Sequence, residues 1–252
     1  MYLSISKRFE FSSSHRLHVS GWSDEQDEAV YGREARSPHG HGHNYVAHFI
    51  FNGPVDEKTG MMINVTAIKD KIKDVIDGQY DHKYFNDDVL SLRDLVPTAE
   101  NLSRLLLKEV QPLFEDTTAR PVACHLSESP TSEATAYEDG RVERHLWMDF
   151  SAARRTHSPF LSDEQNLEYF GRAASPSGHG HHYRLRVTLS GDVDRTHGMI
   201  YPEKESRRIL AELHEQLDHR NLSTDIPQFQ NMPMTTEMLS RFFYTHLDAH
   251  MP

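Results

Sequence analysis

Residues 37–45 read SPHGHGHNY and residues 175–183 read SPSGHGHHY, so one histidine-rich phrase occurs twice in a chain of 252 residues. Five further segments match in the same order at offsets of 137–139 residues. They pair FSSSHRL (11–17) with FSAARRT (150–156), SDEQDEAVYGREA (23–35) with SDEQNLEYFGRAA (162–174), GPVDEKTGMMI (53–63) with GDVDRTHGMI (191–200), YDHKYF (80–85) with LDHRNL (217–222), and TAENLSR (98–104) with TTEMLSR (235–241). Several matches in register indicate a tandem duplication.

The residue patterns predict the same elements in each copy: strand, long loop, strand, helix, helix. Apolar residues alternate from His179 to Ser190, as in a half-buried strand. Apolar positions spaced from Val65 to Ile76 and from Leu102 to Val110 favour amphipathic helices, the second capped at Thr98. We therefore expect two α+β domains, a complete unit at 1–142 and a degenerate unit at 143–252 that lacks the final strands of the first.

Composition excludes several classes of protein. The chain carries 27 Lys and Arg against 38 Asp and Glu, a formal charge of −11, which disfavours nucleic-acid or anionic-membrane partners. The single cysteine, Cys124, excludes an intrachain disulfide and a cysteine-based zinc site. No signal peptide or long apolar run is present in the sequence, so we expect a cytoplasmic protein.

The histidines of the first copy predict a metal site. His41 and His43 lie two apart in a predicted strand and face the same side, and His15 lies at the end of another strand. Three neutral imidazoles with an open fourth position are typical of catalytic Zn2+. On its own an HGH triplet also fits hydrogen-bonded core histidines. In the second copy Arg154 stands where the first has His15, so His179 and His181 are expected to be structural or to bind metal weakly.

Taken together, FSSSHRL, HGHNY, GPVDEKTGMMI, DHK, PTAEN and SESPTSEATAY resemble the 6-pyruvoyl-tetrahydropterin synthase and 6-carboxy-tetrahydropterin synthase family. The resemblance implies a tunnelling fold, in which each unit is a small antiparallel sheet with two helices on one face. Several units assemble into a barrel and hold a pterin substrate between neighbours, which implies a homo-oligomer.

The resemblance also implies roles for residues of the first copy. It implies that His15, His41 and His43 are the zinc ligands. It further implies that Glu128 anchors the pterin ring with help from Thr98 and Glu100, and that Asp81 with His82 transfers protons.

The chain departs from the family pattern at one catalytic position. The family's synthases carry a cysteine just before HGH, but the matching loops YGREARSPHG and FGRAASPSG contain none. Cys124 lies in the predicted strand of Glu128 and is expected to be packed and inert. Glu34 in the first loop is the candidate base if partial burial raises its pKa, although an exposed loop glutamate is an equal alternative.

These observations favour a zinc-dependent lyase acting on 7,8-dihydroneopterin triphosphate to give a 6-pyruvoyl- or 6-carboxy-tetrahydropterin. One alternative is side-chain cleavage to 6-hydroxymethyl-dihydropterin with Glu34 as base. Another is a pterin-binding scaffold without activity, which the missing cysteine and Arg154 favour. The sequence does not distinguish the product or the number of chains in the assembly.

Overall fold

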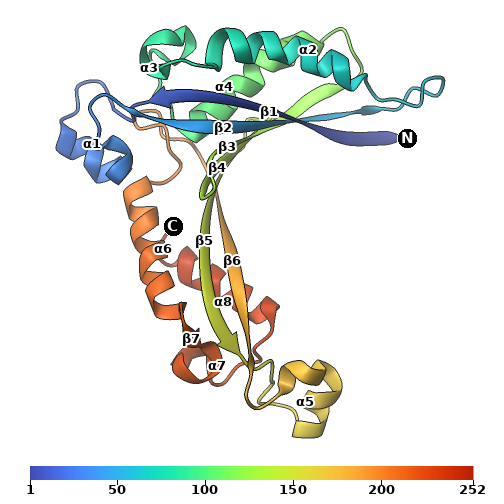
Figure 1. The fold of residues 1–252 in the computed structure, drawn as a ribbon, viewed down its shortest axis with the longest axis vertical. Coiled ribbons are helices and arrows are strands. Elements are labelled where there is room, and N and C mark those ends of the chain that lie inside the picture. The colour runs from blue at the N-terminus through green and yellow to red at the C-terminus, as the bar shows by residue number, and fades with distance from the viewer. Residues whose placement is uncertain (252) are drawn as a thin grey trace. The chain divides into compact units, whose positions relative to one another are not determined.

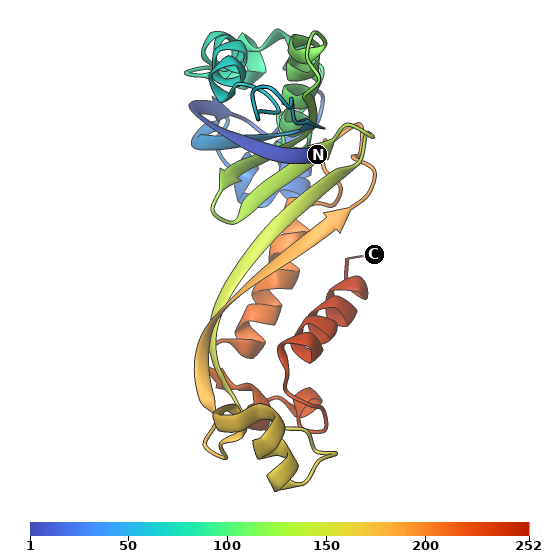
Figure 2. The ribbon, with the colours of Figure 1, turned by 90° about the vertical axis from the view of Figure 1, so that its right-hand side faces the viewer.

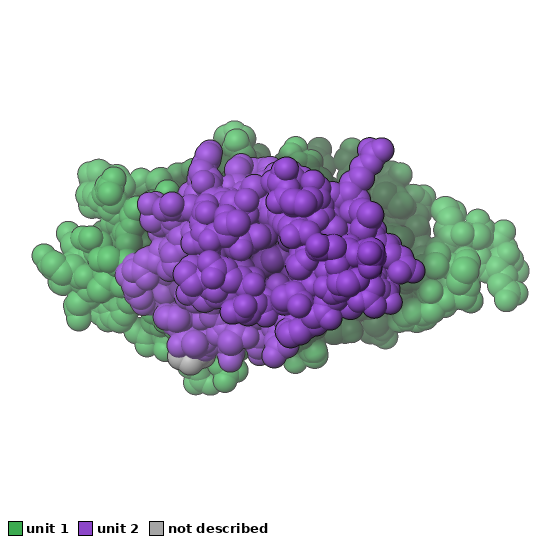
Figure 3. Space-filling view, turned by 90° about the horizontal axis from the view of Figure 1, so that it is seen from below, with its two compact units in different colours: residues 1–147, 187–204 green, residues 148–186, 205–252 purple. Residues whose placement is uncertain are grey.

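The computed structural model describes residues 1–251, which divide into two compact units. Unit 1 comprises Met1–Trp147 and Val187–Lys204, and unit 2 comprises Met148–Arg186 and Glu205–Pro252 (Figure 3). This division follows contacts and not the repeat, because residues 187–204 pack with the first unit. The two domains 1–142 and 143–252 stay a prediction.

Six long strands pair in the order of the sequence. They are β1 (Tyr2–His15), β2 (His41–Pro54), β3 (Arg120–Ser129), β4 (Ser132–Tyr137), β5 (Val142–Arg154) and β6 (His179–Ser190). Neighbours from β1 to β5 are antiparallel, and the short β7 (Arg220–Asn221) adds to β5 in parallel. Within the described residues this path ends at β1 and β6 and does not close.

Helices cover one face of the first four strands (Figures 1 and 2). The helices of this unit are α1 (Asp24–Tyr31), α2 (Val65–Val75), α3 (Phe85–Asp88) and α4 (Ala99–Val110). Ile68 and Ile72 of α2 and Leu106 of α4 join Phe49 and Phe51 of β2 in a fully buried core. The apolar spacings predicted from the sequence are thus the faces that α2 and α4 turn to the sheet.

The second unit repeats the arrangement with α5 (Asp163–Phe170), α6 (Glu203–Leu217), α7 (Leu222–Asp225) and α8 (Thr236–Asp248). Phe150 of β5 stacks on Tyr183 of β6 and meets Phe243 of α8 edge-on. Short 3-10 or π turns complete the chain at Gly32–Ala35, Ile76–Tyr80, Leu90–Leu92, Gln111–Phe114, Gly171–Ala174 and Pro227–Phe229. No helix among residues 1–251 is long and apolar enough to cross a membrane.

The predicted α+β class and the order of elements in each copy are confirmed, with one correction. The loop between the first two strands is not irregular but contains α1 in one copy and α5 in the other. Each of these helices starts with a capping box, formed by Ser23 with Gln26 and by Ser162 with Gln165. The repeated SDEQ segment was the sequence signal for these helices. Thr98 caps α4 as predicted.

The register of the β1–β2 hairpin sets the first-copy histidines on one face. His15 pairs directly with His41, and Ser13 pairs with His43. Gly40, with φ of +78°, lets the chain enter β2 here, since a Cβ at this position would lie 2.6 Å from the carbonyl oxygen of His15. A one-residue slip would turn the histidines to the opposite face.

The turn Asp194–Met199, which follows β6, packs inside unit 1 against the start of α4. Thr98 Oγ1 donates a hydrogen bond of 2.5 Å to the carbonyl of Gly198, and the backbone N–H of Ile200 donates to Glu100 at 3.4 Å. Met199 is buried in a small apolar cluster with Leu17, Tyr31 and Val96. A segment of the second copy therefore covers the helix start of the first.

Because of this contact, we expect the two helix-capping threonines, Thr98 and Thr235, to contribute differently to the free energy of unfolding. Thr98→Ala removes both the cap of α4 and the buried bond to Gly198, and we expect it to cost about 2 kcal/mol in urea unfolding. Thr235→Ala removes only the equivalent cap of α8 and should cost about 1 kcal/mol. Equal losses for the two variants, each fitted to the transition of its own unit, would contradict the double role of Thr98.

Candidate metal centre

Three histidines of the first copy meet at the end of the β1–β2 hairpin. The ligand atoms of His15, His41 and His43 all lie within 4.8 Å of one another, and this is the only such group among the described residues. Nε2 of His15 lies 3.3 Å from Nε2 of His41. The predicted ligand set is therefore assembled by the fold.

Hydrogen bonds and burial prepare two of these rings as neutral ligands. Nδ1–H of His15 donates to the carbonyl of Pro97 at 2.8 Å, which leaves Nε2 to face the cluster. Burial lowers the pKa of both His15 and His43, so both rings are neutral near pH 7. Nε2 of His43 is buried with no hydrogen-bond partner in the described structure.

This donor set fits a zinc ion. Tetrahedral zinc with Zn–N bonds near 2.0–2.1 Å separates two ligand nitrogens by about 3.3 Å. The distance between the Nε2 atoms of His15 and His41 has this value. The unpartnered Nε2 of His43 is a buried polar atom for which a metal ion is a suitable partner.

Glu34 lies beside the cluster, but its pKa is shifted opposite to the expectation. Nε2–H of His41 donates to Oε2 of Glu34 at 2.9 Å. This hydrogen bond, with help from Arg33, outweighs the effect of burial and lowers the pKa of Glu34 to about 2. The same contact raises the pKa of His41. Glu34 is thus placed near the candidate metal centre, and it is ionised.

Glu128 also faces the histidines. From the end of β3, its Oε1 lies 3.4 Å from Nε2 of His15 and 3.9 Å from Nε2 of His43. Its Oε2 accepts a hydrogen bond of 2.9 Å from Ser132 Oγ. A carboxylate oxygen accepts more than one hydrogen bond, so Glu128 keeps capacity for a ligand.

A buried arginine that sequence reasoning missed links this carboxylate to the start of α4. Arg144 of β5 donates to Ser132 Oγ at 2.7 Å and to Glu203 at 3.1 Å, and its Nη1 lies 3.8 Å from Oε2 of Glu100. Glu100 is fully buried, and desolvation raises its pKa despite the nearby Arg144 cation. The signal was available, because Arg144 interrupts an apolar alternation from Val142 to Phe150.

The remaining predicted site residues, Thr98, Glu100, Asp81 and His82, lie around the histidine cluster and not in it. Thr98 and Glu100 are buried under the turn that follows β6, one and three residues beyond the Pro97 carbonyl that holds His15. His82 has an exposed side chain and, with His43, lines a groove of about 540 Å³ along Ser12–Ser14. The fold therefore brings Asp81–His82 to the outer side of the candidate centre.

Asp81 and His82 have a geometry that the second copy repeats. Asp81 accepts a hydrogen bond from the backbone of Ser12 and one of 2.7 Å from His82, whose φ is +56°. Asp218 and His219 make the same contacts to Ser151 and to each other, and φ of His219 is +55°. This motif ties the segment after a helix to the first strand of each copy.

The second copy keeps the frame of the centre without its third imidazole. Gly178 approaches the carbonyl of Arg154 as Gly40 approaches that of His15, so Arg154 stands in the His15 position. Its guanidinium donates to Thr236 Oγ1 at 3.2 Å and lies over the ring of Tyr183. The rings of His179 and His181 remain adjacent, with centroids 4.7 Å apart.

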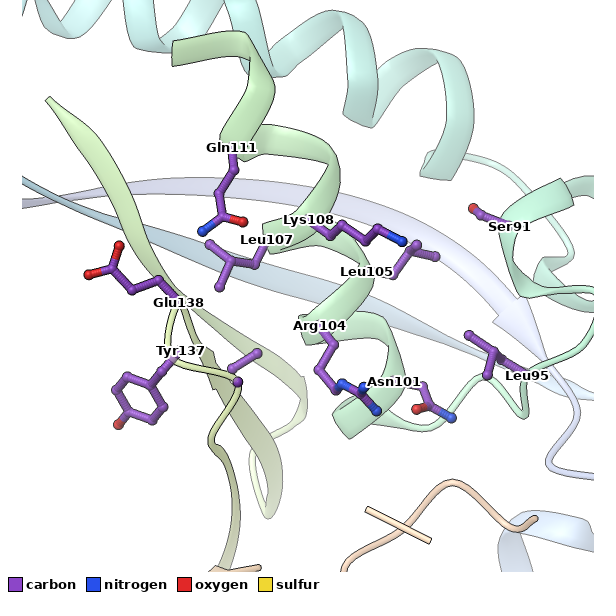
Figure 4. Close-up of a pocket in the computed structure, with 12 residues that line it drawn as sticks. Ser91, Leu95, Asn101, Arg104, Leu105, Leu107, Lys108, Gln111, Tyr137 and Glu138 are labelled. Carbon is purple, nitrogen blue, oxygen red and sulfur yellow. The ribbon is translucent and has the colours of Figure 1, made fainter. Parts of the chain in front are cut away.

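Two other features lie away from the cluster. Cys124 is fully buried and desolvation raises its pKa, so the thiol is not available as a base. A second groove of about 410 Å³, drawn in Figure 4, runs between α4 and the turn after β4. None of the predicted site residues lines it.

Comparison with known proteins gives one consistent result. The family model described as 6-pyruvoyl tetrahydropterin synthase matches residues 4–139 and again 145–252. The human 6-pyruvoyl tetrahydrobiopterin synthase is 38% identical over 106 residues, 42% of this chain and 73% of that protein. The Dictyostelium discoideum enzyme is 38% identical over 112 residues, 44% of this chain and 81% of that protein. The solved Caenorhabditis elegans 6-pyruvoyl tetrahydropterin synthase superposes with a TM-score of 0.51 at 26% identity, covering 54% of this chain and 96% of that one.

The position of Arg144 predicts a large effect on stability. Arg144→Met removes the buried cation that lies beside the carboxylates of Glu100 and Glu203, and we expect a loss of about 3–5 kcal/mol in the free energy of unfolding. Arg141→Met is the control, because Arg141 is exposed and pairs with Glu143 at the surface, where an ion pair contributes about 1 kcal/mol or less. Similar unfolding curves for the two variants would refute the structural importance of this network.

Proposed function

The chain belongs to the 6-pyruvoyl tetrahydropterin synthase family of lyase enzymes, and from this we propose that its first copy holds a zinc-dependent active site for 7,8-dihydroneopterin triphosphate. The expected tunnelling-fold units agree with the Caenorhabditis elegans structure. The observation that carries the proposal is the convergence of His15, His41 and His43 within 4.8 Å.

The three histidines are proposed to hold Zn2+ through their Nε2 atoms. A bound zinc ion would supply Lewis acidity toward the hydroxyl groups of the substrate side chain. His41 has to release the proton that it now donates to Glu34, because coordination requires its lone pair. His15 is kept in the correct tautomer by Pro97.

Glu128 is proposed to bind the pterin ring. The amino-pyrimidine edge of a pterin offers two parallel N–H donors, which a carboxylate accepts side by side. Glu128 is nearly buried, and Ser132 fixes one of its oxygens. Arg144 orients this pair through Ser132. Thr98 and Glu100 would then shape the wall of the pocket from the start of α4.

We assign proton transfer to two groups, His82 and Glu34. His82 is oriented by Asp81 and lines the same groove as His43, which suits a group that exchanges protons with solvent. Glu34 is ionised, and once His41 no longer donates to its Oε2, that oxygen is available to accept a proton from the substrate, while Arg33 remains bonded to Oε1. With Cys124 buried, no thiol takes this role.

The contact between Glu34 and His41 supports a second candidate reaction. A carboxylate base in place of the family's thiol fits cleavage of the substrate side chain to 6-hydroxymethyl-dihydropterin, in place of 6-pyruvoyl- or 6-carboxy-tetrahydropterin formation. A scaffold that binds pterin without turnover is the remaining alternative, and the loss of the third imidazole at Arg154 supports it for the second copy only.

The proposal includes the cellular location and the assembly of the enzyme. We place it in the cytoplasm as a homo-oligomer whose two domains, 1–142 and 143–252, each contribute a tunnelling-fold unit. The second unit then serves structure and not metal binding. No nucleic-acid or membrane partner is proposed, in keeping with the net charge of −11.

Zinc content tests the site directly. We expect about one zinc per chain in purified protein, measured by inductively coupled plasma mass spectrometry. His41→Ala and His43→Ala should each lower zinc affinity by at least about 10-fold, because a donor is lost. The matched variants His179→Ala and His181→Ala should keep the full content. Zinc that is absent from wild-type protein, or that depends on the second-copy pair, would overturn the assignment.

Substitution of Glu34 tests the reaction. Glu34→Gln should keep zinc and pterin binding but slow turnover of dihydroneopterin triphosphate by about 10²–10⁴-fold, the usual contribution of a general base. Glu115→Gln, a change at an exposed turn away from the site, is the control and should leave the rate unaltered. Chromatography of the released pterin identifies the product and so the reaction. Binding without product from wild-type enzyme would establish the scaffold instead.

A further inference from the structure

The second copy leaves buried polar atoms without partners at the place that corresponds to the candidate metal centre. Within the described residues these atoms are Nε and Nη1 of Arg154, Nδ1 of His179 and the hydroxyl of Tyr183. Among the matching residues of the first copy, only His43 has such an atom. A buried polar atom that lacks a hydrogen bond costs free energy, so four of them on neighbouring side chains indicate a binding partner.

The unpartnered atoms of the two copies have opposite polarity. Nε2 of His43 offers a lone pair, which suits a metal cation. A guanidinium carries only N–H donors and a permanent positive charge, so Arg154 suits an anion. In the first copy the hydroxyl of Tyr45 lies 3.4 Å from Nδ1 of His15. In the second copy Arg154 replaces this histidine, and the hydroxyl of Tyr183 has no partner among the described residues.

Arg154 has no carboxylate partner within residues 1–251. Its side chain makes one hydrogen bond there, to the hydroxyl of Thr236 at 3.2 Å, and forms no ion pair. The next residue of α8, Glu237, is held by other groups: hydrogen bonds from its own backbone N–H and from Thr235 lower the pKa of Glu237 more than the charge of Arg154 does. A half-buried cation without a counterion is costly. The position therefore favours an anion from outside the chain.

Hydrogen-bond donors reach this place from three elements of unit 2. Arg154 ends β5, Tyr183 lies in β6, and Thr236 is the first residue of α8. The guanidinium carbon of Arg154 lies 5.9 Å from the centre of the Tyr183 ring, and its bond to Thr236 holds it at the start of α8. The first copy has Ala99 where the second has Thr236, so this hydroxyl belongs to the second copy alone. The N-terminus of a 13-residue helix adds positive potential at the same place.

We propose that Arg154, Tyr183 and Thr236 form a binding site for a phosphate group. A guanidinium donates two parallel N–H bonds to phosphate oxygens. A tetrahedral anion has further oxygens for the hydroxyl of Tyr183 and for that of Thr236, which keeps its own O–H to donate. A carboxylate has two oxygens and satisfies fewer of these donors. The exposed His181, whose ring contacts that of His179, forms the side from which the ligand enters.

The bound group is either inorganic phosphate or the phosphate chain of an organic triphosphate, since both present the same oxygens. The site lies in unit 2 and uses none of the residues proposed for zinc or for the pterin ring. The inference therefore goes beyond the proposed function and does not rest on it. It gives the second copy a ligand of its own, opposite in charge to the metal proposed for the first.

Isothermal titration calorimetry with inorganic phosphate tests the site. Arg154→Gln removes the charge and should weaken binding about 10- to 100-fold, because a hydrogen bond to a charged group is lost. Tyr183→Phe keeps the ring that stacks on Phe150 and removes only the hydroxyl, so it should weaken binding about 2- to 10-fold. Arg241→Gln, at an exposed position further along α8, is the control with the same change of charge and should bind as wild type does. No binding to wild type, or equal losses in Arg154→Gln and Arg241→Gln, overturns the proposal.

Three controls complete the test. Circular dichroism shows whether each variant is folded, and if Arg154→Gln is not, Tyr183→Phe decides. His43→Ala should keep phosphate binding, and its loss there would place the phosphate at the metal centre and contradict the site in unit 2. Acetate that binds as tightly as phosphate would likewise refute a phosphate site.

Sodium tripolyphosphate distinguishes the two sources of the group. Tighter binding than that of phosphate supports the site as one for a phosphate chain, and equal binding supports it as one for free phosphate. Absence of zinc or of turnover while phosphate still binds counts against the proposed function alone.

Discussion

The register of the β1–β2 hairpin is the constraint on which the candidate site depends. It sets His15 opposite His41 and places His43 on the same face two residues further along. Two further contacts hold this arrangement: Pro97 orients the ring of His15, and Asp81 fixes the strand backbone at Ser12. Because neighbouring residues of a strand face opposite sides, a register shift of one residue would turn His15 away from the face that carries His41 and His43.

The second copy keeps this backbone arrangement but lacks one of the three metal-binding imidazoles. Gly178 and Arg154 reproduce the backbone approach of Gly40 and His15, but a guanidinium has no lone pair for a metal. The second copy instead contributes to the first. It supplies Arg144 and Glu203 to the charge network at Glu100, and its Asp194–Met199 turn covers the start of α4. The buried charge network at Glu100 and the packing around the start of α4 are therefore shared between the two copies of one chain.

Much of this could be read from the sequence, because the relevant signals are local. Strand alternation located the sheet, the helical spacing located α2 and α4, and the two-residue spacing of His41 and His43 located the candidate metal centre. The pKa direction of Glu34 could not be read, since it depends on a hydrogen bond to His41 across a loop. The burial of Thr98 and Glu100 could not be read either, because the covering turn lies about 100 residues away in the chain.

The repeat also separates residues kept for the fold from residues kept for chemistry. Asp218 and His219 reproduce the hydrogen bonds that Asp81 and His82 make to the first strand and to each other, in a copy that lacks the third ligand, so this pair has a structural role in both copies. The proton transfer that we propose for His82 would be a second role beside this structural one. Glu34 differs, because Ala173 stands at its place in the second copy. The second copy therefore lacks counterparts of both Glu34 and His15, the base and the metal ligand that we propose for the first copy.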